Sequence, residues 1–195
     1  MTLKNVIFLD RDGVINRDSL EYVKSWAEFE FLPLSLAALA ALTRAGHTLI
    51  LITNQSMIGR GMVPLAVLED MHRRMRAAVV DAGGQIFDLF LCPHRPDEGC
   101  DCRKPEPGLI FQAKTRHGID LPRTIMIGDN AKDIQCGTNA GCGATILVGA
   151  AGDSEAARAV AGKGFAPTAV VEDLNAAAQL ILAGGLLPFA GPDQA

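Results

Sequence analysis

The sequence lacks a long apolar run and an excess of positive charge. No apolar stretch is long enough to cross a bilayer, and the first one, Val6–Leu9, ends at Asp10. We therefore expect neither a membrane span nor a signal peptide. The formal net charge of −4 steers the chain toward neither nucleic acid nor anionic lipid. These absences predict a cytoplasmic protein with no membrane or nucleic-acid partner, and we expect a monomer.

The motifs of several common enzyme classes are missing as well. The chain contains neither a P-loop nor the Gly-x-Ser-x-Gly turn that carries a nucleophilic serine. Gly141 and Gly143 are followed by Ile146 where a dinucleotide-binding fingerprint needs its third glycine, and they precede an expected strand instead of following one. A dinucleotide-dependent enzyme is therefore disfavoured.

What is present is typical of a folded domain. Hydrophobic residues make up 49% and charged residues 21% of the 195 residues, which excludes general disorder. A chain of this length can bury a substantial core, and we expect a single domain over residues 1–183. Residues 184–195 are rich in Gly and Pro and are predicted to form a loosely packed tail.

Apolar runs alternate with helical patterns along the chain. Strands are predicted at residues 5–10, 48–53, 86–91, 124–128 and 144–148, with a weaker one at 168–171. Helices are predicted at residues 34–45, 64–82, 107–117, 131–140 and 173–183. Because the strands are continuous apolar runs between helices, we expect an α/β fold with a Rossmann-like parallel sheet and helices on both faces.

Small polar residues follow three of these strands. Asp10 and Asp12 end the first strand, Thr53 ends the second, and Asp129 ends a later one. The carboxyl ends of parallel strands share one edge of a sheet, where α/β proteins bind their ligands. With Lys104 from a loop, the set offers carboxylates for a divalent ion, a hydroxyl and a lysine for a phosphate, and a carboxylate nucleophile. This combination favours phosphoryl transfer.

The same residues resemble the four motifs of the haloacid dehalogenase superfamily of phosphohydrolases. The motifs are Asp10-x-Asp12-Gly13-Val14, Thr53, Lys104 and Gly128-Asp129-x-x-x-Asp133, in the family's order over residues 5–150. The resemblance implies that Asp10 is the nucleophile and Asp12 the general acid and base, and that Thr53 and Lys104 hold the phosphoryl group. It further implies a catalytic Mg²⁺ held by Asp10, the main-chain carbonyl of Asp12, Asp129 and Asn130, with Asp133 in support.

A second cluster combines three cysteines with a histidine. Cys92, His94, Cys100 and Cys102 lie within eleven residues, just before Arg103-Lys104. Disulfides are not expected in the cytoplasm, and thiolates with an imidazole suit tetrahedral Zn²⁺. No open coordination position is implied. We therefore predict a structural Zn²⁺ that clips the loop 92–102 and positions the phosphate-binding lysine.

A closer resemblance is to the branch of this superfamily that hydrolyses the 7-phosphate of D-glycero-D-manno-heptose 1,7-bisphosphate, or histidinol phosphate. It is carried by the stretches 10–16, 53–56, 60–61, 92–94 and 100–105. The resemblance implies a minimal cap, a small phosphorylated sugar as substrate and a substrate wall made of short loops. The expected wall residues are Asp18, Tyr22, Asn54, Gln55, Ser56, Arg60 and Arg103. Arg103 would bind the second phosphate or sugar hydroxyls.

Several departures from that branch leave the sugar open. Ser19-Leu20-Glu21 precedes Tyr22 where a Gly is common, Met57-Ile58-Gly59 stands where Gly-Ile-Ala is usual, and Asn130 replaces a common Lys. A phosphatase for histidinol phosphate or another small phosphomonoester therefore remains an alternative. The intact carboxylates and lysine disfavour a non-catalytic metal-binding or interaction module.

The other histidines, the remaining cysteines and the aromatic residues are expected to be structural. His47 is predicted at a strand start, His117 near a helix end, and His72 on a solvated helix face formed by residues 72–76. Cys136 and Cys142 are expected to be small core residues. A packing cluster is predicted for Trp26, Phe29 and Phe31.

Overall fold

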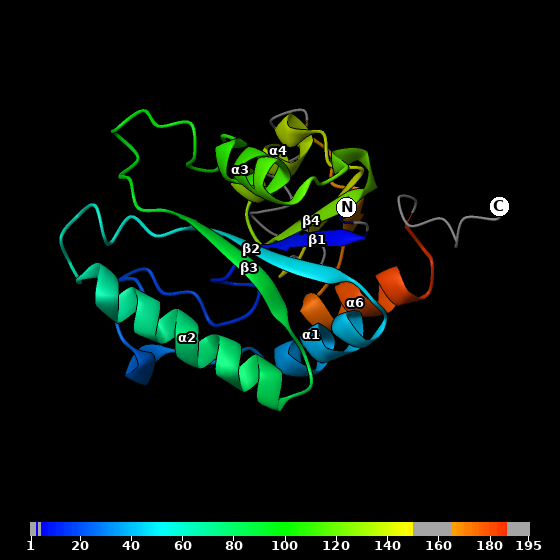
Figure 1. Ribbon diagram of the computed structural model, residues 1–195, viewed down its shortest axis with the longest axis horizontal. Coiled ribbons are helices and arrows are strands. Elements are labelled where there is room, and N and C mark those ends of the chain that lie inside the picture. The colour runs from blue at the N-terminus through cyan, green and yellow to red at the C-terminus, as the bar shows by residue number, and fades with distance from the viewer. Residues whose placement is uncertain (1–2, 4, 150–164, 187–195) are drawn as a thin grey trace.

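The described residues form one parallel sheet with helices on both faces (Figure 1). The computed structural model describes residue 3, residues 5–149 and residues 165–186. Within that part of the chain the strands are β1 (Val6–Leu9), β2 (Thr48–Asn54), β3 (Ile86–Cys92), β4 (Thr124–Gly128), β5 (Ala144–Leu147) and β6 (Ala169–Val170). They pair in parallel in the order β3-β2-β1-β4-β5-β6.

Two helical layers cover the sheet. One face carries α1 (Ser35–Arg44), α2 (Leu65–Asp81) and α6 (Leu174–Leu182), and the other carries α3 (Gly108–His117) and α4 (Ala131–Ala140). Two short 3-10 helices, η1 (Trp26–Glu28) and η2 (Leu121–Arg123), lie in connections. No helix of the described residues is both long and apolar enough to cross a membrane.

The central strand shows why the sequence forms this sheet. All four residues of β1 are 0% exposed, because both faces are covered by helices. Side chains alternate along a strand, so Ile7 and Leu9 join the core under α1, α2 and α6, whereas Val6 and Phe8 join the core under α3 and α4. A continuous apolar run is thus required here.

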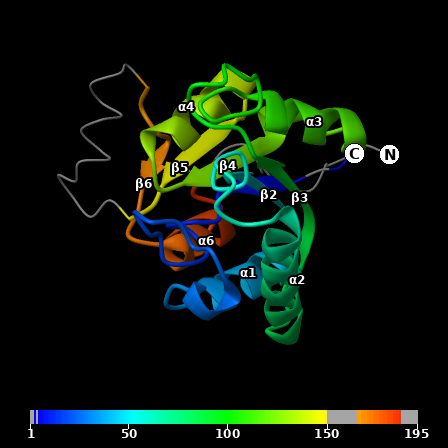
Figure 2. The ribbon, with the colours of Figure 1, turned by 90° about the vertical axis from the view of Figure 1, so that its left-hand side faces the viewer.

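The direction in which successive strands are added to the sheet reverses at β1. The chain proceeds from β1 to β2 and β3 on one side, then returns to β4 on the other side of β1. Loops that leave neighbouring strands therefore diverge at the carboxyl ends of β1 and β4 and leave a crevice between them. Figure 2 looks onto this edge, with the segments after β1 and β2 in front of the sheet.

The predicted strands and helices are confirmed to within a few residues, including the short strand near 168–171. The minimal cap is also as expected, since residues 10–34 hold only η1 and two isolated β-bridges, and residues 93–107 form a loop. Trp26, Phe29 and Phe31 form the predicted aromatic cluster, with ring centroids 5.0 to 6.3 Å apart. Of the predicted tail, residues 187–195 lie outside the described part of the chain.

The solvated helix face predicted at 72–76 is partly wrong. His72 is 6% exposed and Met75 is 0% exposed, whereas Arg73, Arg74 and Arg76 are exposed. His72 follows Met71 on the stripe of α2 that packs on the sheet, where residues recur every three or four positions. Its imidazole therefore faces the interior.

Candidate active site

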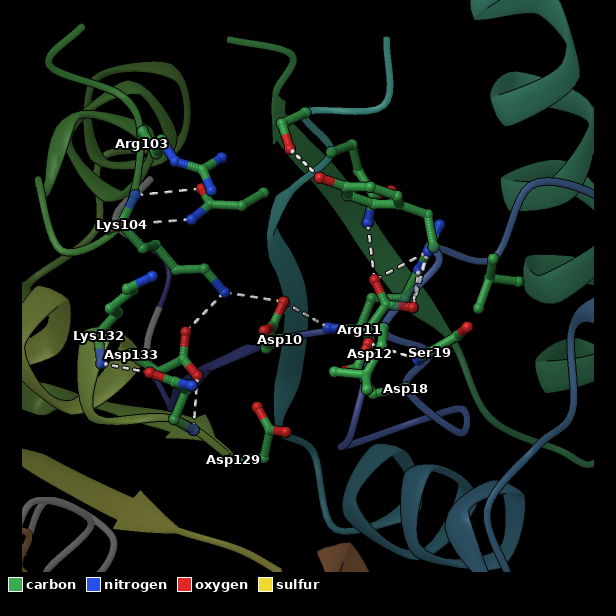
Figure 3. Close-up of a pocket in the computed structure, with 17 residues that line it drawn as sticks. Asp10, Arg11, Asp12, Asp18, Ser19, Arg103, Lys104, Asp129, Lys132 and Asp133 are labelled. Atoms are coloured by element: carbon green, nitrogen blue, oxygen red, sulfur yellow. Dashed lines mark hydrogen bonds and ion pairs between the residues drawn. The ribbon is translucent and has the colours of Figure 1, made fainter. Parts of the chain in front are cut away.

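A cavity of about 440 Å³ opens at the carboxyl ends of β1, β2 and β4. Its size is in the range of pockets that hold small molecules. The lining side chains come from the segments that follow those strands and from the loop before α3 (Figure 3). They are Asp10, Arg11, Asp12, Asp18, Ser19, Leu20, Tyr22, Val23, Asn54, Gln55, Ser56, Arg103, Lys104, Asp129, Asn130, Lys132 and Asp133.

Lys104 is a buried cation of this cavity. Its side chain is 2% exposed, and Nζ lies 2.8 Å from Oδ1 of Asp10 and 2.7 Å from Oδ1 of Asp133 (Figure 3). Burial alone would lower the pKa of Lys104, but the two carboxylates outweigh burial and raise the pKa above its usual value. The lysine is therefore charged and fixed between the ends of β1 and α4.

Asp10, Asp129 and Asp133 crowd three carboxylates together. One oxygen from each lies within 4.8 Å of the others. Burial raises the pKa of Asp10 to about 7, with Asp133 adding to the rise and Lys104 opposing it. Burial, Asp133 and Asp10 raise the pKa of Asp129 to about 8. One lysine does not neutralise this charge, and carboxylate oxygens are the ligands that Mg²⁺ prefers, so the group fits a divalent cation.

The side chain of Asp12 is surrounded by hydrogen-bond donors. Arg11 Nη2 lies 2.7 Å from Oδ1 and 2.8 Å from Oδ2, and Arg11 Nε lies 3.1 Å from Oδ1. Asn16 Nδ2 donates to Oδ1 at 2.8 Å and Gln55 Nε2 donates to Oδ2 at 2.9 Å. Burial alone would raise the pKa of Asp12, but these donors, Arg11 above all, hold it below its usual value.

Two amides at the carboxyl end of β2, Asn54 and Gln55, connect parts of the site. Gln55 Nε2 donates to Thr53 Oγ1 at 2.9 Å as well as to Asp12. Asn54 holds the main chain of Lys104 at both ends, since its Oδ1 accepts from Lys104 N at 3.1 Å and its Nδ2 donates to Lys104 O at 3.2 Å. The carboxyl end of β2 therefore fixes the loop that carries the lysine.

The hydroxyl of Tyr22 marks the outer wall. Ser56 Oγ donates to it at 3.4 Å. This hydrogen bond, together with the nearby guanidinium groups of Arg60 and Arg103, lowers the pKa of Tyr22. Tyr22 has a φ of +65°, a left-handed conformation that costs a residue with a Cβ some strain and is held by its surroundings. Two cations and two hydroxyls thus converge a short way from the carboxylates.

The Cys/His cluster is assembled as predicted. Sγ of Cys92, Cys100 and Cys102 and Nδ1 of His94 all lie within 4.8 Å of one another, and the shorter separations run from 3.2 to 3.6 Å. Tetrahedral Zn²⁺ with bonds of about 2.0–2.3 Å requires ligand atoms roughly 3.3–3.8 Å apart. The donor set and its spacing fit that ion.

The loop with this cluster is tied to its neighbours. Gln55 N donates to Cys92 O at 2.8 Å and Gly59 N donates to Pro93 O at 3.0 Å. Arg103 Nη1 donates to His94 O at 3.2 Å. The cluster therefore stands between the segment after β2 and the loop that carries Arg103 and Lys104.

The cavity gathers most, but not all, of the residues expected from sequence. Thr53 lies beneath it, 1% exposed, and Arg60 lies outside its lining, beside the hydroxyl of Tyr22. The side chain of Asn130 accepts from Lys132 N at 3.1 Å and caps α4. Sequence reasoning missed Lys132 at the rim, and it missed Arg11 and His72 behind Asp12.

Comparison with known proteins places this site in a family. Residues 101–177 match the sequence model of the HAD-hydrolase-like family. The chain is 41% identical to the D-glycero-β-D-manno-heptose-1,7-bisphosphate 7-phosphatase of Bordetella bronchiseptica over 91% of this chain and 97% of that protein. It is 45% identical to the enzyme of the same name from Pseudomonas aeruginosa over 71% of this chain and 78% of that protein.

A solved structure extends the likeness to three dimensions. The crystal structure of D,D-heptose 1,7-bisphosphate phosphatase from B. bronchiseptica, complexed with magnesium and phosphate, superposes with a TM-score of 0.84 at 41% identity, covering 92% of this chain and 99% of that one. Sequence and structure agree over nearly the whole length. The chain belongs to the HAD-like hydrolases, in the family of the heptose-1,7-bisphosphate 7-phosphatases.

Proposed function

We propose that this protein removes the 7-phosphate of D-glycero-β-D-manno-heptose 1,7-bisphosphate through a phosphorylated Asp10. The observation that carries the proposal is the relative of that name from B. bronchiseptica, which is 41% identical over 91% of this chain. The carboxylates and buried lysine of the cavity supply the groups that such a reaction needs.

In the first step, Asp10 attacks the phosphorus of the 7-phosphate and the bond from phosphorus to the C7 oxygen breaks. Asp12 gives a proton to that oxygen, so that an alcohol leaves instead of an alkoxide. Because Arg11 holds the pKa of Asp12 low in the free protein, Asp12 takes up this proton when the negatively charged phosphate binds beside it. Lys104 neutralises the transferring phosphoryl group from its place beside Asp10. Thr53 accepts a hydrogen bond from Gln55, which leaves its own proton free to donate to a phosphoryl oxygen.

In the second step, water attacks the phosphorus of the aspartyl-phosphate. Asp12, now ionised, takes a proton from the water, and the bond between Asp10 and phosphorus breaks. Inorganic phosphate leaves, Asp10 is again a carboxylate and Asp12 is again protonated. The same side chain acts as acid and then as base, so its position matters in both steps.

The carboxylate group is proposed as the Mg²⁺ site. Asp10, Asp129 and the main-chain carbonyl of Asp12 would hold the ion, and Asp133 would keep Lys104 in place through its ion pair. A bound Mg²⁺ offsets the negative charge of the phosphoryl group and of the carboxylates around it. Asn130 would add its side-chain oxygen to this set, and the same oxygen caps α4 in this structure by accepting from Lys132 N.

The second phosphate of the substrate would bind at the outer wall. Arg103 lines the cavity beside Lys104, and Arg60 and the hydroxyls of Tyr22 and Ser56 lie near it. A guanidinium binds a phosphate through two parallel hydrogen bonds. We further propose that the Cys/His cluster holds a structural Zn²⁺, which fixes the loop that ends in Arg103.

A comparison of substrates tests the proposal. Purified protein with Mg²⁺ is assayed for phosphate release from the α and β anomers of the heptose bisphosphate and from histidinol phosphate. We expect kcat/KM for the β anomer to be the highest by about tenfold or more, a difference of about 1.4 kcal/mol. A preference of that size for histidinol phosphate would assign the protein to that substrate instead.

A further inference from the structure

Arg11 lies between the two motif aspartates in sequence, yet it is only 1% exposed. Its guanidinium contacts two elements at once. Nε and Nη2 hold Asp12, and Nη1 reaches α2, where it lies 3.1 Å from Nε2 of His72 and 3.7 Å from Sδ of Met71. The proposed mechanism gives neither Arg11 nor His72 a role.

The contact with Arg11 defines the state of His72. A guanidinium only donates hydrogen bonds, so Nε2 of His72 must accept and its ring proton must lie on Nδ1. The side chain is 6% exposed, and burial with the nearby charge of Arg11 lowers the pKa of His72 to about 3, against the pull of Asp12 and with a smaller contribution from Arg76. The imidazole is therefore a neutral acceptor.

The guanidinium of Arg11 is held on one side by His72 and on the other by Asp12. Its donors form a rigid planar fork, so a bond from Nη1 to α2 also fixes the directions of Nε and Nη2. These two nitrogens contact both oxygens of Asp12. The ring of Phe29 lies 6.0 Å from Cζ and limits movement to one side.

We propose that Arg11 and His72 are positioning residues for the proton transfers of this site: His72 holds the guanidinium, and the guanidinium holds the carboxylate of Asp12 at the angle of transfer. The inference rests on the proposed role of Asp12 as acid and base. A guanidinium that served only to balance the charge of Asp12 would need no acceptor on α2. Asp12 also keeps bonds to Asn16 and Gln55, so Arg11 adds orientation to a carboxylate already partly held.

Two substrates with different leaving groups can distinguish whether Arg11 positions Asp12 for proton transfer or only supports the fold. Expelling a sugar alkoxide requires a proton from Asp12, whereas p-nitrophenolate leaves without one, and kcat/KM reports the steps up to phosphorylation of Asp10. We expect Arg11→Met to lower kcat/KM for the heptose bisphosphate by about 100-fold, the lower range of acid–base contributions. For p-nitrophenyl phosphate the loss should stay below about fivefold. Equal losses on both substrates would overturn the proposal.

Substitutions at His72 test the contact between His72 and Arg11. They also provide the test if the Arg11→Met variant does not fold. His72→Gln keeps an acceptor oxygen for Arg11, whereas His72→Leu fills similar space without one. We expect His72→Leu to lose about 10-fold or more on the heptose bisphosphate but not on p-nitrophenyl phosphate, and His72→Gln to recover most of that loss. Arg73→Gln, exposed on the same helix, is the control. Equal activity of the two His72 variants would also contradict the proposal.

The proposed substrate and the proposed positioning of Asp12 by Arg11 and His72 can be disproved independently of each other. If the wild-type protein hydrolyses p-nitrophenyl phosphate but not the heptose bisphosphate, the proposed substrate is wrong. Histidinol phosphate, also an alkyl phosphate with a poor leaving group, then replaces the sugar in the same comparison. Crystal structures of both His72 variants give a reading independent of substrate, since only His72→Leu should show the carboxylate of Asp12 turned from its wild-type position.

Discussion

The carboxylate of Asp129 lies against the backbone of Gly13. A Cβ atom at residue 13 would come within 2.0 Å of Asp129 Oδ2, and Gly13 has a φ of +75°. Glycine is therefore needed at this position for two reasons, the left-handed turn after Asp10 and the close approach of the carboxylate of Asp129, which follows β4. The proposed sharing of one cation by the two strand ends therefore depends on the absence of a side chain at residue 13.

Gly13→Ala should accordingly weaken Mg²⁺ binding by about tenfold or more, because the added methyl displaces Asp129 and one lost ligand contact costs about 1.4 kcal/mol or more. The measurement is a calorimetric titration with Mg²⁺. Gly46→Ala is the matched control, since Gly46 also has a positive φ but nothing lies within 4 Å of its Cβ position. Unchanged affinity in Gly13→Ala would show that Asp129 is not a ligand.

Asp10→Asn should abolish turnover and leave the fold intact. An amide does not attack phosphorus, so phosphate release should fall by about 10⁴-fold or more, while the amide oxygen still accepts a hydrogen bond from Lys104. Phosphate release and the melting temperature are measured together. Asp120→Asn is the control, because Asp120 is exposed before η2. Retained turnover would refute Asp10 as the nucleophile.

Stability of the metal-free protein should fall as the pH rises through neutrality. The pKa values of Asp10 and Asp129 are about 7 and about 8 in the folded protein against an ordinary 3.8. The folded state thus keeps protons that the unfolded state has already lost, and this stabilisation disappears as the pH rises through the folded pKa values. Thermal unfolding in EDTA from pH 5.5 to 8.5 measures the effect, and a flat or rising melting temperature would contradict it.

Mg²⁺ should restore the lost stability at high pH. At a concentration of about 100 times its Kd, a ligand of the folded state adds about 2.7 kcal/mol, or roughly 5–10 °C for a chain of this size. The shift should shrink toward pH 5.5, because protons compete for the same carboxylates. Gly13→Ala offers a second check, since its melting temperature should respond less to the ion.

Asn54→Ala should impair catalysis through Lys104. It leaves the main-chain N–H and C=O of Lys104 without their partner, and a misplaced lysine should lower kcat/KM by about 10-fold or more. Asn139→Ala is a close control, because Asn139 donates at 3.3 Å to the carbonyl of the next residue, Pro105, from α4. Its effect should stay within about twofold. If both variants behave alike, the bonds from Asn54 do not position the lysine.

The zinc proposal predicts about one zinc ion per wild-type chain. Cys100→Ser should lose most of it, because a hydroxyl is a poor substitute for a thiolate, and kcat/KM should fall since Arg103 and Lys104 follow directly. Elemental analysis of purified protein provides the measurement. Cys142→Ser, outside the cluster, should keep its zinc. Zinc content that is unchanged in Cys100→Ser would remove this cysteine from the site.

The fold could be predicted because a buried parallel sheet has a simple signature. Strands covered on both faces are built from apolar runs, as in Val6–Leu9, and their polar residues concentrate at the strand ends. The catalytic candidates stand at those ends, so their meeting at one edge followed from topology. The Cys/His cluster could also be predicted from the sequence, because its members lie within eleven residues of one another.

The side chains that hold the site residues in place could not be predicted from the sequence. Contacts such as Asn54 with the main chain of Lys104 join segments far apart in sequence and depend on side-chain direction. His72 did carry a signal, since it falls among Leu68, Met71 and Met75 on the apolar stripe of α2, but its polarity and the neighbouring arginines suggested a solvated face. The burial of Arg11 was not predicted either, because a charged residue between two aspartates is typical of an exposed loop.

The position of β1 between β2 and β4 has a consequence for how the chain is made. Residues 6–9 emerge from the ribosome more than 100 residues before residues 124–128, so their hydrogen-bonding edge on the β4 side stays open until those residues arrive. An apolar strand with an open edge is a template for pairing with other chains. Nascent chains stalled before residue 124 should therefore be prone to aggregate and to need chaperones, and no fragment that ends there can hold the complete site.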